Sequence, residues 1–367
     1  MKKIALVILI SFSASIWSCN KQTDTPQVPE PEVLPEYDPT PYVLDYSYFP
    51  NPKIPQDNQL TVQKVQLGRM LFYEKKLSKG ETQSCADCHL QVDGFSDVRQ
   101  FSLGVDDLPG RRQAMPVFNM AWHTNGFFWD GRAPLLRDQA LKPIQDPLEM
   151  NETLENAVAK LQETQEYRFQ FARAFEDSTI TSEKMGLAME QFMNTILSMN
   201  SKYDQFLLGN ATLSESEQRG HELFFTEFDP NGNTKGGECF HCHAGVNFTN
   251  NKFMNNGLDD EASFADLGYF ETTANDSDKA KFKVPSLRNI AATAPYMHDG
   301  RFATLDEVLN HYNHGVKNSS TVDEIMQYNI NPGLQLTEQD KADIIAFLHT
   351  LTDETYLTNT EYSSPFK

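Results

Sequence analysis

The sequence predicts a mainly helical protein of two similar halves with long loops, and three observations support this prediction. Strand-like alternation of apolar and polar residues is sparse along the chain. The length of 367 residues favours two domains. The segment GRMLFYE at residues 68–74 has a counterpart, GHELFFTE, at residues 220–227, and each precedes a cysteine pair by a nearly equal distance. We interpret this repetition as an internal duplication.

Each of these segments leads into a C-x-x-C-H run. The runs consist of Cys85, Cys88 and His89 in the first half and of Cys239, Cys242 and His243 in the second. This pattern is the attachment signature of c-type haem, in which two cysteines bind the porphyrin and the histidine binds the iron. The alternatives are a zinc site, which needs four converging ligands, and disulfides. Because the two runs use four of the five cysteines, we predict two cytochrome c-like haem domains, with the haems near their interface.

The start of the chain resembles a targeting segment. Lys2 and Lys3 precede an apolar run that is too short to span a membrane, and Cys19 follows it as the odd cysteine. We interpret residues 1–19 as a bacterial lipoprotein signal, with Cys19 as the lipidated residue; an ordinary cleaved signal is the alternative. Either signal predicts export, and lipidation predicts a periplasmic protein anchored to a membrane. The rest of the chain divides into a Pro-rich tether (20–45), two haem domains (46–209 and 210–355) and a tail (356–367).

The formal charge of −20 limits the kinds of partner that we expect for the protein. Such an acidic chain is repelled by nucleic acid and by anionic membrane surfaces, so we expect neither as a partner. The charge permits a basic protein partner, but acidic balance more often serves solubility.

Helix signals occur at several places along the chain. Apolar positions predict a helix over residues 60–73. Asn151 is a candidate cap for one helix through residue 175, and Thr181 or Ser182 for another towards residue 207. The remaining signals are capping boxes at Ser214 with Glu217 and at Thr304 with Glu307, an end to the latter helix at 313–315, and a last helix over 337–351.

The sequence around both runs resembles the bacterial di-haem cytochrome c peroxidases. In the first half the matching blocks are LGRMLF (67–72), LS (77–78), GFSD (94–97), FWDGRA (128–133) and DPLEM (146–150). In the second half they are FT (248–249), VPSLRN (284–289) and APYMHDG (294–300). The family also includes the di-haem enzyme that matures methylamine dehydrogenase by oxidising its tryptophans. The resemblance implies that the first haem reacts with peroxide and that the second accepts electrons.

The resemblance also implies roles for single residues. Glu149 matches the catalytic glutamate, which moves a proton between the peroxide oxygens, and Gln139 matches the distal glutamine. Trp129 matches the tryptophan between the haems, and His298 is expected to bond a propionate or a structural water. A calcium ion is implied at the carbonyl groups of Thr293 and Pro295, with the side chain of Gln113. Without the resemblance, Glu149 and Gln139 would be interpreted as surface polar groups and Trp129 as core packing.

Two positions depart from the family pattern. Peroxidases that need reductive activation carry a histidine after the block FSLG (101–104), where this chain has Val105. This change predicts an enzyme that is active without prior reduction; the alternative is that His123 takes the place of the missing ligand. The second haem usually takes a methionine as its sixth ligand, but the matching residue here is Tyr312, as in the tryptophan-oxidising relative. The competing candidates for this ligand are Met297, His311 and His314.

These observations predict a peroxidase with two covalent haems that reduces hydrogen peroxide to water. Its electrons would come from a small redox protein, either a c-type cytochrome or a cupredoxin, and the sequence is compatible with a homodimer. The first alternative is a protein-oxidising enzyme, favoured by Tyr312 and by the absent histidine. The second is a non-enzymatic electron carrier, which has no need of the acid-base pair Glu149 and Gln139.

Overall fold

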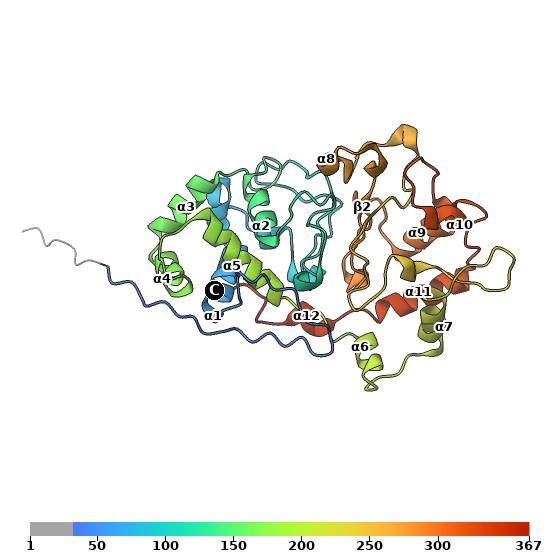
Figure 1. Cartoon of the computed structure of the whole chain (residues 1–367), viewed down its shortest axis with the longest axis horizontal. Coiled ribbons are helices and arrows are strands. Elements are labelled where there is room, and N and C mark those ends of the chain that lie inside the picture. Colours follow the sequence, from blue (N-terminus) through green and yellow to red (C-terminus); the bar gives the residue numbers. More distant parts are fainter. Residues whose placement is uncertain (1–31, 367) are drawn as a thin grey trace, which may run out of the picture. The chain divides into compact units, whose positions relative to one another are not determined.

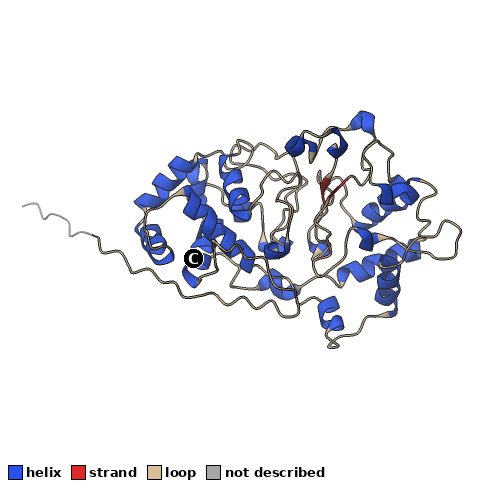
Figure 2. Cartoon of the chain, in the orientation of Figure 1, coloured by secondary structure: helices blue, strands red, loops and turns tan. Residues whose placement is uncertain are grey.

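The computed structural model describes residues 32–366, in which one compact unit begins at Pro35 (Figure 1). The predicted signal and Cys19 lie outside the described residues. The unit is mostly helical, as predicted (Figure 2). One small antiparallel sheet pairs β1 (Phe253–Met254) with β2 (Phe282–Lys283), so that Phe253 lies opposite Lys283. Within the described part of the chain, no helix is long and apolar enough to cross a membrane.

The helices fall into two groups along the chain. The first group contains α1 (Val62–Phe72), α2 (Leu136–Gln145), α3 (Leu154–Glu163), α4 (Gln165–Ala174) and α5 (Ser182–Thr195). The second contains α6 (Lys202–Leu207), α7 (Glu215–Phe224), α8 (Phe270–Thr273), α9 (Leu305–Asn310), α10 (Gln327–Ile330), α11 (Glu338–His349) and α12 (Glu354–Thr358). Helices α1 to α5 and α12 surround one apolar core, α6, α7, α9 and α11 surround a second, and long loops with short 3-10 turns connect the helices.

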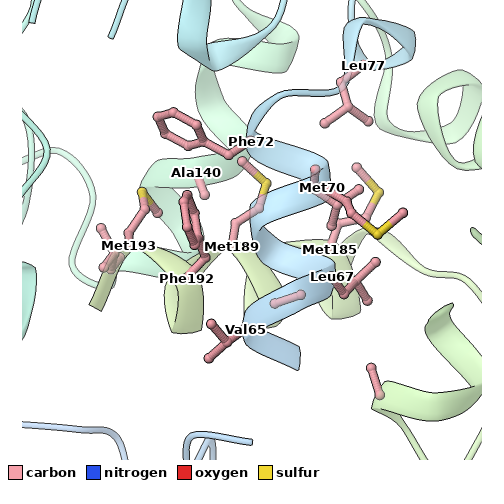
Figure 3. Close-up of a cluster of buried hydrophobic side chains, with 14 of the residues drawn as sticks. Val65, Leu67, Met70, Phe72, Leu77, Ala140, Met185, Met189, Phe192 and Met193 are labelled. Atoms are coloured by element: carbon pink, nitrogen blue, oxygen red, sulfur yellow. The ribbon is translucent and has the colours of Figure 1, made fainter. Parts of the chain in front are cut away.

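The two halves share one helix crossing, which supports the internal duplication. In the first half α1 packs on α5, with Met70 and Phe72 against Met189 and Phe192 (Figure 3). In the second half α7 packs on α11 in the same way.

The crossings depend on a glycine at the same place in each repeat. A Cβ atom on Gly68 would lie 2.0 Å from the Ala188 carbonyl oxygen, and one on Gly220 would lie 1.8 Å from that of Asp343. Real Cβ atoms do not come so close, so only glycine lets the two helices approach this far.

Two of the predicted helices are each divided into two shorter helices in the structure, so these two predictions were wrong. The helix expected over 152–175 breaks at Thr164, whose extended backbone separates α3 from α4, and Thr153 caps it in place of Asn151. The break allows α4 to turn and bury Tyr167 and Phe171 in the first core.

The helix expected from residue 182 towards 207 ends at Thr195, because Ile196 is extended. The carbonyl of Ile196 accepts the backbone N–H of Asn119, and the chain crosses to the second half before Ser201 caps α6. The other helix predictions agree with the structure, and the helix that begins after Thr304 continues from α9 as a π-helical turn that ends at Gly315. Thr181 caps α5, both capping boxes form, and the ends of α1 and α11 lie within two residues of those expected.

Both ends of the compact unit pack on the first half. The segment after Pro35 is hydrogen-bonded before Tyr46, since the Asp38 N–H donates to the Arg173 carbonyl and the Val62 N–H to the Thr40 carbonyl. The last residues leave the second half, and Tyr356 and Tyr362 join the first core. Their segment is held by side chains of the first half: Arg69 donates to the carbonyls of Thr360 and Ser363, Tyr73 to that of Tyr362, and Gln91 to those of Tyr356 and Asn359.

Candidate active site

Both cysteine–histidine runs fold into short 3-10 turns that orient the histidine ring in the same way. His89 Nδ1 lies 2.9 Å from the Phe95 carbonyl oxygen, and His243 Nδ1 lies 3.1 Å from that of Phe248. Because a carbonyl can only accept, Nδ1 carries the proton and Nε2 keeps its lone pair for a metal. Burial lowers the pKa of His89, and that of His243 to about 4, so both rings stay neutral as an iron ligand requires.

Each run lines a cavity. The first cavity is lined by Cys88 and His89, and the second by Cys239, Cys242 and His243. Cys85 packs at the edge of the first core. All four thiols are free. Two free thiols beside a neutral imidazole at a cavity are the donor set that covalent haem needs, so the residues present fit the group.

The wall of the first cavity brings Glu149 and Gln139 together with His89. Gln139 lies on α2, and Glu149 follows in the turn after that helix, where its N–H donates to the Asp146 carbonyl at 3.0 Å. Burial and the charge of Asp146 raise the pKa of Glu149 to about 7, against the opposing charge of Arg132. A carboxyl group with such a pKa can both accept and donate a proton near neutrality.

The loop that contains Gly104 and Val105 contacts the backbone at Glu149. The Val105 N–H donates to the Glu149 carbonyl at 2.8 Å, and a Cβ atom on Gly104 would lie only 2.2 Å from the Leu148 carbonyl oxygen. The side chain of Val105 is not part of the cavity wall, although Leu103 and Gly104 are. The alternative ligand His123 does lie in this wall, with its Nε2 3.2 Å from Asn247 Nδ2, and burial lowers its pKa to about 3.

The second cavity contains two of the four candidate sixth ligands. Tyr312 and Met297 line it, whereas His311 and His314 do not. Asn256 contacts three of the four: its Nδ2 lies 3.2 Å from Tyr312 Oη and 3.5 Å from Met297 Sδ, and its backbone oxygen lies 3.1 Å from His311 Nε2. Burial raises the pKa of Tyr312 to about 12. The structure thus leaves Tyr312 and Met297 as the candidates that face the second haem site.

Trp129 lines both cavities, so its ring lies between the two sites. The indole N–H donates to the Gln113 carbonyl at 2.8 Å, which fixes the orientation of the ring. His298 lines the second cavity and stacks on Phe282, with ring centroids 3.6 Å apart.

The residues expected for calcium all line the second cavity, namely Gln113, Thr293 and Pro295. The amide nitrogen of Gln113 donates to Ser96 Oγ and to the Asp97 carbonyl, each at 3.0 Å. The amide oxygen is therefore the atom of this side chain that is suited to a cation.

Sequence reasoning missed three residues at these sites, namely Arg132, Asn256 and Lys283. Arg132 lies near Glu149 and stacks on Phe128, with its guanidinium carbon 3.6 Å from the ring centroid. Lys283 lines both cavities. The only sequence signal for Lys283 was a charged residue inside the apolar stretch FKVP (282–285), and Asn256 gave none.

Comparison with known proteins defines the class. A family model described as di-haem cytochrome c peroxidase matches residues 62–212. The chain is 32% identical to the methylamine utilization protein MauG of Methylophilus methylotrophus over 81% of this chain and 84% of that protein. It is 33% identical to the cytochrome c peroxidase Ccp of Escherichia coli (strain K12) over 81% of this chain and 60% of that protein.

A crystal structure of a MauG-like protein associated with microbial copper homeostasis superimposes with a TM-score of 0.79 at 36% identity, covering 87% of this chain and 98% of that one. These relatives define the class as oxidoreductases of the c-type cytochrome kind. The chain belongs to the di-haem cytochrome c peroxidase family, which includes MauG, and this family implies two haem c groups.

Proposed function

We propose that the protein reduces hydrogen peroxide to water at the first site, with two electrons and two protons for each peroxide. The observation that carries this proposal is the wall of the first cavity, where Glu149 and Gln139 lie with His89. An electron carrier needs no acid-base group in such a cavity. Haem held by Cys85, Cys88 and His89 would supply an iron that binds one peroxide oxygen and transfers electrons to it.

The side chains of the wall would manage the protons. The Glu149 carboxylate accepts the proton of the near peroxide oxygen and returns it to the far oxygen, which leaves as water. The Gln139 amide can donate a hydrogen bond to the peroxide and hold it in line with the carboxylate. Arg132 lowers the pKa of Glu149 and so favours the ionised form that starts this transfer.

Electrons would enter at the second site from a small redox protein, such as a c-type cytochrome or a cupredoxin. Trp129 supports electron transfer between the two sites, because an aromatic ring that lines both cavities can relay electrons from one to the other. We also propose that the resting enzyme reacts without prior reduction. Val105 has no ligating atom, and its loop is bound to the backbone of Glu149.

The test uses the purified protein with both haems attached. Intact mass should show two haems, and peroxide should be consumed in step with oxidation of a reduced small cytochrome. Peroxide added to the fully oxidised protein should change the haem spectrum within milliseconds. A spectrum that stays unchanged until an electron is supplied would contradict the open resting state and point to His123 as a ligand.

A second candidate function is oxidation of a protein substrate, as the resemblance to the tryptophan-oxidising member of the family suggests. Tyr312 in the second cavity favours it, because a phenolate oxygen stabilises oxidised iron whereas a methionine sulfur favours the reduced form. Under this function, peroxide would be consumed with oxidation of a tryptophan-containing protein and not of the cytochrome. Replacing Tyr312 by Phe should change the spectrum of the second haem alone, and an unchanged spectrum would favour Met297 as the ligand.

The cellular location and the calcium ion are proposals that rest on the sequence. We propose export to the periplasm with a lipid on Cys19, which the mass of the mature N-terminal peptide tests. We also propose one calcium ion at Gln113, Thr293 and Pro295. Chelation should then change the haem spectra, and added calcium should restore them.

A further inference from the structure

Lys283 is a buried cation at the junction of the two cavities. It lies on β2, only 2% of its surface is exposed, and it lines both cavities. Its backbone N–H donates to the Trp129 carbonyl at 2.8 Å, which ties it to the ring between the two sites.

The ammonium group of Lys283 has no carboxylate partner among residues 32–366. Its Nζ donates to the Thr124 carbonyl and lies 5.5 Å from the centroid of the Phe253 ring. Burial lowers its pKa to about 8, so the group still carries a proton at neutral pH. A buried charge without a counter-ion is costly, and buried charges in proteins are paired.

The other cations of the first cavity are paired, which makes Lys283 the exception among the described residues that line it. Arg111 binds Glu271 at 2.9 Å, Arg112 binds Asp266 at 2.7 Å, and Arg132 binds Asp130 at 3.0 Å. The described residues therefore supply no anion to Lys283, so its counter-ion would come from a bound group.

The position of Nζ indicates which cavity that anion would occupy. The partner of Nζ, Thr124, belongs to the first half. Burial, together with the charge of Lys283, lowers the pKa of the neighbouring His123, which lies in the first cavity wall. The ammonium thus reaches from a strand of the second half to the first site.

We propose that Lys283 binds a propionate carboxylate of the first haem and that its positive charge raises the midpoint potential of this haem. The proposal rests on the two-haem assignment of the proposed function. A nearby positive charge disfavours ferric iron, which carries one charge more than ferrous iron, so the charge favours reduction. The second half would in this way adjust the potential of the first haem.

Spectroelectrochemical titration of the holoenzyme tests this assignment. Replacing Lys283 by Met removes the charge at similar length and should lower the midpoint potential of the first haem more than that of the second. Lys283→Arg should keep the wild-type potential. Lys281→Met is the matched control, because Lys281 binds Asp278 and lines neither cavity, and it should change neither potential. Unchanged potentials in Lys283→Met, or a shift of the second haem alone, would overturn the proposal.

A measurement on the wild type covers the case in which Lys283→Met does not assemble. Protein labelled with ¹⁵N-lysine should give lysine bands in the infrared difference spectrum between the oxidised and reduced first haem, and their absence would refute the contact. These readouts are independent of turnover. A protein with the expected shift but without peroxide activity would refute the proposed function and leave the Lys283 assignment standing.

Discussion

The two halves of the chain carry the same framework on opposite sides of Trp129. In each, a glycine on the lead-in helix allows a close helix crossing, and a phenylalanine carbonyl orients the histidine of the C-x-x-C-H run. The rest of each cavity wall differs. The first contains Glu149, Gln139 and Arg132, whereas the second contains Tyr312 and Met297 beside Asn256. The duplicated framework can thus attach a cofactor in each half, while the loops that differ between the halves can determine the chemistry of each site.

The largest expected effect concerns this difference in the walls. Replacing Glu149 by Gln should lower peroxide turnover by about 10²–10⁴-fold, because a general acid-base group typically contributes that much. Both haems should stay attached, and the spectrum of the second should be unchanged. Glu155→Gln is the control, since this glutamate is exposed and lies outside the cavity. Turnover within a few-fold of wild type in Glu149→Gln would show that another group moves the proton.

A second prediction concerns the segment that leaves the second half and completes the first. Tyr356 is 1% exposed in the first core, so Tyr356→Ala should lower the free energy of unfolding by about 3–5 kcal/mol. The buried Tyr356 hydroxyl has no hydrogen-bond partner within the described residues, so Tyr356→Phe should keep or raise stability.

Urea unfolding followed through the absorption of each haem measures both Tyr356 variants. The first haem should lose its native spectrum first in Tyr356→Ala. Loss of the second haem's spectrum first would contradict the assignment of this segment to the first core.

The two helix crossings should respond alike to a methyl group. Gly68→Ala and Gly220→Ala each force a Cβ atom into a backbone carbonyl and should cost about 1–3 kcal/mol, as overpacking does. Gly110→Ala is the control, because its nearest neighbour would be 3.6 Å away. If only one of the two variants lowers the urea midpoint, the crossings are not equivalent and the duplication is less close than the geometry indicates.

The last prediction concerns the pH dependence of the first site. The pKa of Glu149 is raised to about 7, and proton transfer starts from its carboxylate, which becomes protonated as the pH falls below that value. The rate of the peroxide reaction should therefore fall by about tenfold per pH unit below 7. Rapid mixing across pH 5–8 measures this, and an acid limb that persists in Glu149→Gln would assign the titration to another group.

Local signals in the sequence predicted much of this structure. Capping boxes such as Ser214 with Glu217 form because both partners lie within one turn. In the C-x-x-C-H runs, the spacing of the residues likewise determines that the two cysteines and the histidine lie close together. The breaks at Thr164 and Ile196 were missed, because they depend on packing with distant segments. The domain boundary near Gly209 stays a prediction.

The candidate site was predictable only where a family motif marks it. Trp129 and Glu149 lie in such blocks, Gln139 lies between these two blocks, and the roles of all three stay predictions. Lys283 and Asn256 were not found, because their relevance to the site depends on which residues and cavities they contact in the folded chain. A charge without a partner is visible only when the surroundings of the side chain are known.

The return of the last residues to the first core has a consequence for biosynthesis. Domains generally fold from the N-terminus as the chain emerges, but the first half here cannot complete its core until Tyr356 and Tyr362 have been made. The half that is synthesised first is therefore finished last.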